Sequence, residues 1–570
     1  MARNKRYGFG HSPRRCPAPG VFALAVSGLV VGGTWAAGTV TPQPKMGEPL
    51  EGLTAEELAL WEVGRVQFDR VMLIEDGLGP IFNKESCGNC HNVPVLGGSG
   101  SQTVTRFGRS EKGGFDPLEE FGGSLLQAQA IDPDCAEVVH PDANVESFRV
   151  TNGSMGYGLI EAIPDADILA LEQPPPGISG RAHMVEAFEA AGISRAGRFG
   201  WKAQVPTILT FSADAARNEM GITNIFVPTE NDPNGILPPD LADCDTVPDP
   251  EDHLDSEDFY FFDRVTHFLR FLAPPPQTPR SGMTGEGVFE TTGCSQCHTP
   301  QFITADDRDL EAALRNKVIR PYSDFLLHDI GEHADFIVQG DAGERELKTP
   351  PLWGLNKRDP VWHDGRFGGG TFAERVTLAI EAHGGFGSEA LDSGVFAAWQ
   401  ALTQPDKDHL VAFLASLGRI EFDHDDDDDV ERDDFVAFHA CFETGGPFTP
   451  DDVCAISDID QDGDVDLDDY DGFLLAYTGP EEDCNDNGIL DLTDIVEGTS
   501  LDSNGNGIPD ECEACIADLD GDGNVGFGDL LELLSFWGPC PDCPQDLDGS
   551  GEVGFGDLLF LLSAWGLCRG

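Results

Sequence analysis

Two short strings with the pattern Cys-x-x-Cys-His constrain this chain more than any other feature. They read CGNCH at 87–91 and CSQCH at 294–298. Two thiols at this spacing can form thioethers to one porphyrin, and the histidine that follows can bind the iron. A zinc site would need a second ligand pair nearby, and a redox thiol pair would not need the histidine twice. The strings therefore predict two covalently bound haem c groups, held by Cys87, Cys90, His91, Cys294, Cys297 and His298.

The segments around the two strings repeat as well. A phenylalanine, Phe82 or Phe289, lies five positions before the first cysteine of each string. Far downstream, residues 261–276 and 409–420 carry apolar side chains at i, i+3, i+4 and i+7, which predicts one apolar helix face in each. Prolines 274–276 should end the first helix. This order predicts two successive cytochrome c-like haem domains.

The start of the chain is typical of an export signal. A basic segment is followed by an apolar run at 21–33 and by the small-residue stretch TWAAG, so we expect cleavage near Ala36 or Ala37. A membrane anchor fits less well, because the run is short for a bilayer span. We expect an extracytoplasmic protein, periplasmic or secreted to the cell surface, with no membrane span in the mature chain.

The cysteine count agrees with export. Of 15 cysteines, Cys16 and the four haem thiols leave ten, and an even number in an exported chain suggests up to five disulfides. Cys135 and Cys244 form the natural pair in the first haem domain, because no other candidate lies there. The remaining pairings stay open at this point.

The net charge is −66, from 101 acidic and 35 basic residues, which argues against nucleic acid or an anionic membrane as a partner. Many of the acidic residues lie after residue 420, and they recur there at the spacing of calcium loops. Such loops place oxygen ligands at positions 1, 3, 5 and 12. Looser loops lie at 483–494 and 502–513. The predicted calcium ligands are Asp423, Asp425, Asp427, Asp434, Asp458, Asp460, Asp462, Asp469, Asp518, Asp520, Asp522, Asp529, Asp546, Asp548, Ser550 and Asp557.

These paired loops, each followed by one helix and ending in Asp, resemble type I dockerin modules. The pair at 518–570 is the closest match, with the near-identical segments LLELLSFWG and LLFLLSAWG. The resemblance implies a cohesin-like protein partner for the tail. The alternative is a calcium-stiffened stalk or surface-retention module.

Six segments between residues 60 and 420 carry a second resemblance. In order they are GYGLIEAIPD (156–165), GRFGWKA (197–203), ARNEMGIT (216–223), PYSDFLLHDIG (321–331), KTPPLWGL (348–355) and WHDGRFGGGTF (362–372). Together they resemble a di-haem oxidoreductase family described as peroxidases or thiol oxidoreductases, which is related to the bacterial di-haem cytochrome c peroxidases. The resemblance implies one haem as an electron relay and one for chemistry. No residue supports the thiol activity, because haem and disulfides account for the thiols.

The second haem needs a sixth ligand if it is to act as the relay. No methionine follows Met283, so the candidates are His328, His333, His363, His383 and His409. In the relatives this ligand follows the HDG motif by about one short helix, which implies His383. The segment FGGGTFAERV makes the gap here longer than the family pattern. His363 is expected to line the space between the haems.

The first haem, on His91, would then be the reactive group, and it needs a nearby acid or base. Glu161 is the candidate by resemblance, although a structural carboxylate in the turn before Pro164 is the alternative. Met155 could instead close this haem and leave an electron carrier. Trp201 is a candidate aromatic between the haems, although core packing explains a tryptophan equally well.

Taken together, these patterns predict a mainly α fold, with two cytochrome c-like haem domains followed by small helical EF-hand or dockerin-like calcium repeats. Electrons from a small cytochrome or cupredoxin would enter at haem 2, and peroxide or another small oxidant would be reduced at haem 1. The alternative is a non-enzymatic di-haem carrier tethered by its tail. The predicted segments are a signal peptide (1–37), two haem domains (45–276 and 277–420), a dockerin-like loop pair (421–480), a calcium-repeat linker (481–514) and a second loop pair (515–570).

Overall fold

The computed structural model describes most of the chain after residue 42, and the described residues fall into two compact units that meet at residues 420 and 421. We call them the redox unit and the tail unit. The predicted signal segment 1–37 lies outside the described residues. The described residues are 43–112, 114–172, 177–235, 244–245, 247–276, 284–425, 427, 429–442, 453–459, 464–485, 487–510, 512, 517–521, 524–540, 543–548 and 550–567.

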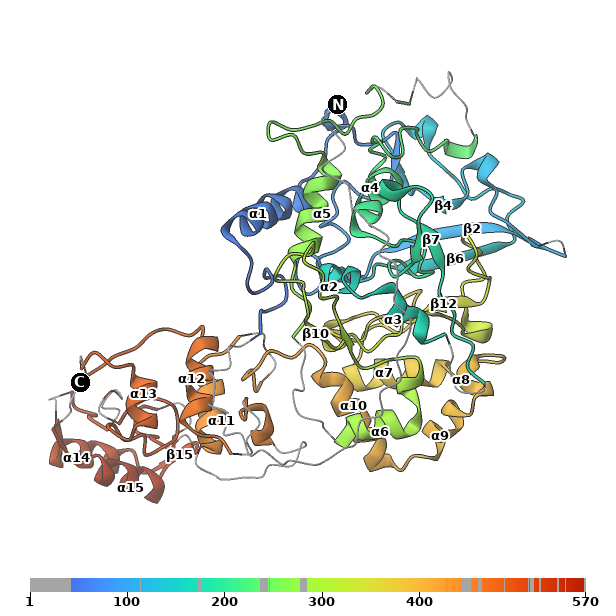
Figure 1. Ribbon diagram of the computed structural model, residues 1–570. Helices are drawn as coiled ribbons and strands as arrows, with labels where there is room; N and C mark the ends of the chain where they lie inside the picture. The colour runs from blue at the N-terminus through green and yellow to red at the C-terminus, as the bar shows by residue number, and fades with distance from the viewer. Residues whose placement is uncertain are drawn as a thin grey trace, which may run out of the picture. The chain divides into compact units, whose positions relative to one another are not determined.

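Ten α-helices and twelve short strands are described in the redox unit (Figure 1). The helices are α1 (Ala55–Asp69), α2 (Tyr157–Glu161), α3 (Asp165–Ala170), α4 (Ile208–Met220), α5 (Phe261–Phe271), α6 (Thr284–Thr292), α7 (Phe372–Ala382), α8 (Glu389–Asp392), α9 (Val395–Ala401) and α10 (Gln404–Ser416). The strands are β1 (Ile81–Phe82), β2 (Thr103–Glu111), β3 (Gly114–Asp116), β4 (Ser124–Leu126), β5 (Gln129–Ala130), β6 (Val145–Val150), β7 (Met184–Glu186), β8 (Ser194–Ala196), β9 (Phe302–Ile303), β10 (Val318–Ile319), β11 (Leu327–Asp329) and β12 (Glu346–Lys348).

Two helix crossings organise the redox unit, and each relies on a glycine. α1 crosses α5 (Figure 1), where a Cβ on Gly64 would lie 2.4 Å from the Arg264 carbonyl oxygen. α6 crosses α10, where a Cβ on Gly285 would lie 2.0 Å from the His409 carbonyl oxygen. Only glycine lets the backbones approach this closely. The same crossing therefore occurs once beside each Cys-x-x-Cys-His string.

The two predicted packing helices are confirmed as α5 and α10. α5 ends at Phe271, before the prolines at 274–276. On α5, Val265, Phe268 and Leu269 are at most 4 % exposed, and on α10 the equivalent apolar side chains are buried as well. An apolar helix face of this kind is stable because packing removes it from water.

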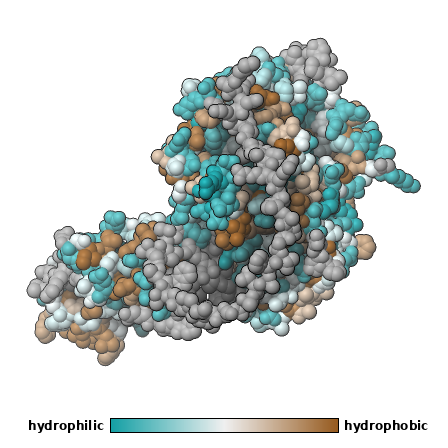
Figure 2. All heavy atoms as spheres, in the orientation of Figure 1, coloured by the Kyte–Doolittle hydropathy of each residue, from teal (hydrophilic) through white to brown (hydrophobic). Residues whose placement is uncertain are grey.

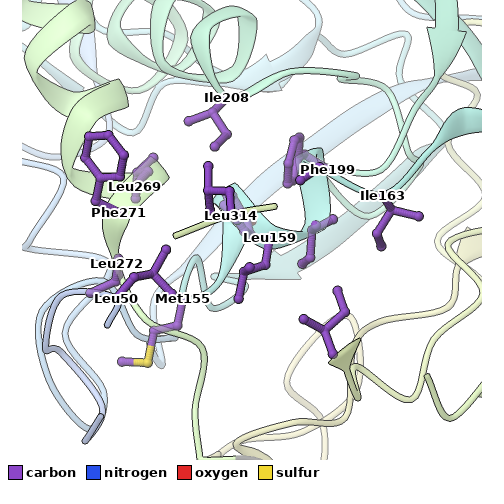
Figure 3. Close-up of a cluster of buried hydrophobic side chains, with 14 of the residues drawn as sticks. Leu50, Met155, Leu159, Ile163, Phe199, Ile208, Leu269, Phe271, Leu272 and Leu314 are labelled. Carbon is purple, nitrogen blue, oxygen red and sulfur yellow. The ribbon is translucent and has the colours of Figure 1, made fainter. Parts of the chain in front are cut away.

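A large apolar cluster joins both halves of the redox unit. It includes Met155, Phe199 and Leu269 together with Leu314 and Trp353. Figure 3 shows α2 residues at its centre, with Met155 beside Leu50 and Leu272 at one end. The boundary predicted at residue 277 thus crosses a shared core, and residues 43–420 form one compact unit.

The prediction of a mainly α fold with EF-hand or dockerin-like repeats is wrong, because the described chain mixes helices with several small sheets. The largest sheet has the order β3-β2-β4, and β6 pairs with β2 in antiparallel register from Thr103 opposite Val150 to Gly108 opposite Val145. These strands are far apart in sequence. Short strands that pair in this way leave little periodicity in the sequence to detect.

The tail unit combines short helices with two-stranded ladders. Its helices are α11 (Arg432–Cys441), α12 (Leu467–Ala476), α13 (Asp491–Val496), α14 (Phe527–Ser535) and α15 (Phe555–Ser563). Its strands, β13 (Asn524–Val525), β14 (Gly538–Pro539), β15 (Glu552–Val553) and β16 (Gly566–Leu567), pair as β13 with β16 and β14 with β15. This cross-pairing joins the α14 and α15 repeats. Among the described helices of the whole chain, none has the length and apolarity of a bilayer span.

The predicted disulfide between Cys135 and Cys244 is confirmed. Three further disulfides lie in the tail unit, Cys441–Cys454, Cys484–Cys512 and Cys540–Cys543. Cys515 and Cys568 lie outside the described residues. The four motif cysteines carry no disulfide.

Candidate functional site

The first Cys-x-x-Cys-His string forms a tight turn after α1. The backbone N–H of His91 donates to the Cys87 carbonyl at 3.0 Å, and the His91 ring is held through Nδ1 by the Gly98 carbonyl at 3.1 Å. Phe68 of α1 packs edge-on against this ring at 6.0 Å between centres. Because a carbonyl holds Nδ1, the other nitrogen, Nε2, is the one available to a metal.

The second string repeats this geometry. The His298 N–H donates to the Cys294 carbonyl at 2.9 Å, and Nδ1 of the ring lies 3.0 Å from the Tyr322 carbonyl oxygen. Phe289 packs edge-on against the ring at 6.2 Å. Phe289 thus supports its own histidine, whereas Phe82 packs in the cluster around Met220 instead. The repeat in sequence therefore predicts the turn but not the aromatic that supports the ring.

The motif thiols lack the character of a redox pair. Burial is the main cause that raises the pKa of Cys87 to about 12 and of Cys90 to about 11. Burial likewise raises the pKa of Cys294 to about 12 and raises that of Cys297. Reactive cysteines have lowered pKa values, because the thiolate is the nucleophile. Covalent attachment to a porphyrin fits these half-buried thiols better than thiol exchange.

A largely apolar cavity of about 270 Å³ opens beside the second string. Cys294, Cys297 and His298 line one side of it, and His383 lines it as well. The His298 and His383 ring centres are 6.5 Å apart. Two metal–nitrogen bonds of about 2 Å, added to the two ring radii, span roughly 6 Å. Nδ1 of His383 lies 2.8 Å from the Ala379 carbonyl oxygen, so Nε2 of both rings is available for an iron between them.

A buried lysine and a half-buried arginine also line this cavity, and sequence reasoning missed them. Lys348 of β12 is 4 % exposed, and burial lowers the pKa of its amine to about 7. Burial also lowers the pKa of Arg358 to about 10. Neither forms an ion pair within the described part of the chain, although buried charges normally do. The carboxylates of a haem would supply the missing partners, and the position of Lys348 in KTPPLWGL was the available signal.

His363 and Trp201 lie together in the same cavity, and their place between two haems stays a prediction. Their ring centres are 6.3 Å apart. The Val150 backbone joins them, because its N–H donates to the His363 carbonyl and its carbonyl accepts from the Trp201 indole. His363 is 2 % exposed, and neither ring nitrogen has a hydrogen-bond partner among the described residues. Burial lowers its pKa to about 4, so the ring is neutral near pH 7.

The other histidines proposed as the sixth ligand are placed differently. His328 lies between two carboxylates, with Nε2 2.8 Å from Asp324 and Nδ1 2.9 Å from Glu389. Burial alone would lower its pKa, but hydrogen bonds to Asp324, Cys297 and Glu389 raise it well above the ordinary value. A protonated imidazole cannot bind iron. The His333 ring contacts Arg366, and His409 is on α10.

Glu161 is not brought to the cavity. One carboxylate oxygen lies 2.9 Å from the Arg270 guanidinium, and the other accepts the Ile208 N–H at the start of α4 at 2.5 Å. Met155 is 4 % exposed and packs in the shared core. Its neighbour Ser154 binds the Gly97 carbonyl, next to the loop that holds His91.

The acidic loops of the tail unit share one hydrogen-bond pattern. The first aspartate accepts backbone N–H groups four or five residues later, as Asp546 does from Ser550 and Gly551. The last aspartate accepts two N–H groups, one of which is at the start of the next helix, as Asp557 does from Gly554. Oxygens of Asp423, Asp425 and Asp434 lie within 4.8 Å of one another. Asp460, Asp462 and Asp522 lie outside the described residues.

Comparisons with known proteins point to a redox family. A family model described as "Di-haem oxidoreductase, putative peroxidase" matches residues 135–417. A MauG-like protein associated with microbial copper homeostasis is similar at 16 % identity and TM-score 0.30, over 68 % of this chain and 95 % of that one. Hydrazine synthase of Kuenenia stuttgartiensis is similar at 13 % identity and TM-score 0.27, over 70 % and 100 %. At these scores neither superposition carries an argument. No curated protein matches the chain.

The matched segment includes the second string, His363 and His383, and it ends before the tail unit. The first string lies upstream of it and repeats the geometry of the second. The family match, together with the duplicated haem-binding turns, supports the di-haem oxidoreductase family for this chain.

Proposed function

We propose that this protein is an exported di-haem c-type oxidoreductase that relays electrons through haem 2 and reduces peroxide or another small oxidant at haem 1. The observation that carries the proposal is the pair of Cys-x-x-Cys-His turns whose histidines are both held through Nδ1. A c-type haem supplies redox chemistry, and its availability to an oxidant depends on whether the sixth position is open.

The chain's own residues suit a closed second site. His298 and His383 would hold the iron from both sides, while Lys348 and Arg358 would compensate the propionates. Reducing one hydrogen peroxide to two waters takes two electrons and two protons. The electrons would come from a small donor protein of the cytochrome or cupredoxin type. Six-coordinate ligation leaves no place for an oxidant at haem 2, so this site favours electron transfer.

We assign proton transfer to His363 rather than to Glu161, because the cavity that His363 lines also reaches Ser99, next to the Gly98 carbonyl that holds His91. His363 is neutral near pH 7, and its ring nitrogens lack partners among the described residues. Both carboxylate oxygens of Glu161 are already engaged, so its role is to fix the start of α4 to Arg270. A general acid or base must be free to exchange its proton with the reacting group.

The proposal predicts two covalent haems and two different iron environments. Mass analysis of the mature protein should show two added haem masses, and the ferric spectrum should contain one high-spin and one low-spin signal. Cyanide or peroxide should change the high-spin signal only. Fewer than two haems would refute the redox assignment. Two low-spin signals that ignore peroxide would instead favour an electron carrier, with Met155 as the ligand of haem 1.

We further propose that the acidic loops of the tail bind calcium. Asp546→Ala should lower the calcium content of the full-length protein by about one equivalent, because it removes the first ligand of a loop. Elemental analysis after gel filtration measures this content. Glu497→Gln, at an exposed site on the tail unit, is the matched control and should change nothing. Equal calcium content in the natural chain, Asp546→Ala and Glu497→Gln would contradict the proposal.

A cohesin-like partner for the tail is proposed from a repeated apolar surface. Phe527 and Leu531 on α14, and Phe555 and Leu559 on α15, are 62–75 % exposed at matching positions. Figure 2 shows apolar residues gathered over these helices. Contiguous exposed apolar patches mark interaction sites. A recombinant cohesin domain should bind the natural chain and lose affinity for Asp546→Ala, whereas binding that ignores calcium would contradict the idea.

A further inference from the structure

Four carboxylates outside the haem region gather in the segment that joins α4 to α5. Oxygens of Glu230, Asp245, Asp249 and Glu251 lie within 4.8 Å of one another. The confirmed disulfide at Cys244 adjoins the cluster. Its residues are far from the acidic loops in sequence, and the cluster belongs to the redox unit rather than to the tail unit.

Glu230 is the unusual member of this cluster. It is 8 % exposed, and neither of its carboxylate oxygens accepts a hydrogen bond from a described residue. Burial, followed by the charges of Glu251 and Asp249, raises its pKa to about 11. Burying a carboxylate without a hydrogen-bond donor or a counter-charge is unfavourable. Glu230 therefore lies in the cluster with neither a donor nor a cation among the described residues to balance it.

The surrounding residues do not supply that cation. The Arg217 guanidinium donates to the backbone carbonyls of Thr229 and Glu230 and forms no ion pair with the four carboxylates. Thr223 donates its N–H to Glu251, and its hydroxyl lies within hydrogen-bond distance of both Glu251 and Asp249. These bonds orient two carboxylates toward the cluster. Among the described residues, none of the four acids forms an ion pair.

We propose that Glu230, Asp245, Asp249 and Glu251 bind one divalent cation, and that this cation is calcium. All four donors are oxygen, which excludes the softer metals that favour nitrogen or sulfur. Calcium takes six to eight oxygen ligands in a flexible geometry, whereas magnesium requires a near-ideal octahedron. Glu230 also lines an open cavity of about 760 Å³, from which water can complete the shell.

The position of the site gives it a structural role beside the first haem string. Thr223 follows the end of α4 by three residues, and Met220 at that end lies 4.0 Å from Cys87 through its sulfur. Glu251 also packs against Gly77, where an added Cβ would approach it to 2.3 Å. A bound cation would hold the segment after α4 in place, and with it the surface against which Cys87 packs. The inference does not depend on the proposed redox activity.

The test compares the full-length protein with its Glu230→Gln variant, each stripped with EGTA and then returned to calcium. Unfolding is followed by the haem absorbance, which reports on the redox unit alone. Calcium should raise the unfolding temperature of the natural chain by a few degrees, because a ligand of the folded state stabilises it. Glu230→Gln should lose this rise and bind one calcium fewer by elemental analysis. Without calcium the variant should be at least as stable as the natural chain, because the amide leaves one acid fewer in the buried cluster.

Glu146→Gln, at an exposed position on β6, is the matched control and should behave as the natural chain. If Glu230→Gln does not fold with two haems, Asp249→Asn replaces it with the same expected losses. Equal calcium content in the natural chain and the variant would overturn the proposal. The proposal would also be overturned if calcium left the unfolding temperature of the natural chain unchanged and only acid raised it. The four carboxylates would then be sharing protons.

Discussion

Replacing His383 with alanine should convert the low-spin ferric signal to high-spin and nearly abolish donor-dependent peroxide turnover. His298 and His383 are 6.5 Å apart between ring centres across the cavity, each with Nδ1 held by a backbone carbonyl. Changes to groups that only support a metal ligand already cost roughly 10–100-fold. Loss of the ligand itself should therefore lower turnover by more than roughly 100-fold.

Exogenous imidazole should restore the low-spin signal of His383→Ala, because it can refill the vacated ligand position. His333→Ala is the matched control, since it removes another candidate histidine whose ring contacts Arg366 instead. It should retain the low-spin signal. A His383→Ala protein with an unchanged spectrum, or a His333→Ala protein that loses the signal, would show that His383 is not the ligand.

Asp335→Asn is expected to destabilise the redox unit strongly. Asp335 accepts two bonds from Arg149, at 2.9 and 2.6 Å, and its other oxygen lies 2.8 Å from the Lys202 amine. All three side chains are at most 4 % exposed. The variant would leave two buried cations without a counter-charge, which costs about 3–5 kcal/mol. Denaturant unfolding followed by haem absorbance measures the loss.

The same substitution should change how stability depends on pH. Burial alone would raise the pKa of the Asp335 carboxyl, but Arg149 and Lys202 outweigh it and hold the pKa below its ordinary value. A lowered carboxyl pKa gives stability that is present above the unfolded pKa and is lost as the pH falls through the folded pKa. The advantage of the natural chain over Asp335→Asn should therefore shrink in acid.

Asp116→Asn provides the comparison for this prediction. Asp116 pairs with Arg109 at 2.7 Å, but both side chains are about one third or more exposed. Water screens such a pair, so its loss should destabilise the protein far less than the loss of Asp335 does. An Asp335→Asn protein as stable as Asp116→Asn would contradict the account of the buried triad.

The triad also links stability to the candidate site. Arg149 precedes Val150, whose backbone contacts His363 and Trp201, and Lys202 follows Trp201 directly. Asp335 therefore fixes the two chain segments that place these rings in the cavity. We expect that loosening it would disturb the cavity before the whole unit unfolds.

Local spacing in the sequence was enough to predict several features. Each Cys-x-x-Cys-His string closes its own turn, and the apolar i, i+3, i+4 and i+7 pattern predicts α5 and α10 without knowledge of their partners. The pairing of Cys135 with Cys244 followed from the scarcity of alternatives. These predictions succeed because the interactions that decide them lie within a few residues or leave one choice.

The errors arose where distant segments meet. The pairing of β2 with β6 overturned the mainly α prediction. No periodicity within either strand indicates which strand it pairs with. Nor does the sequence around Glu161 indicate that Arg270 and the start of α4 hold both its oxygens. Long-range contacts such as these depend on loop closure and on packing, which a local pattern does not encode.

By itself the sequence determined that two porphyrin-binding turns exist, where two packing helices lie, and that acidic loops recur after residue 420. Only the tertiary structure decided that His383 faces His298, that two carboxylates enclose His328, and that four acids converge at Glu230. The physical reason is that a side chain's charge and ligand capacity depend on what surrounds it, and here those surroundings come from segments far apart along the chain.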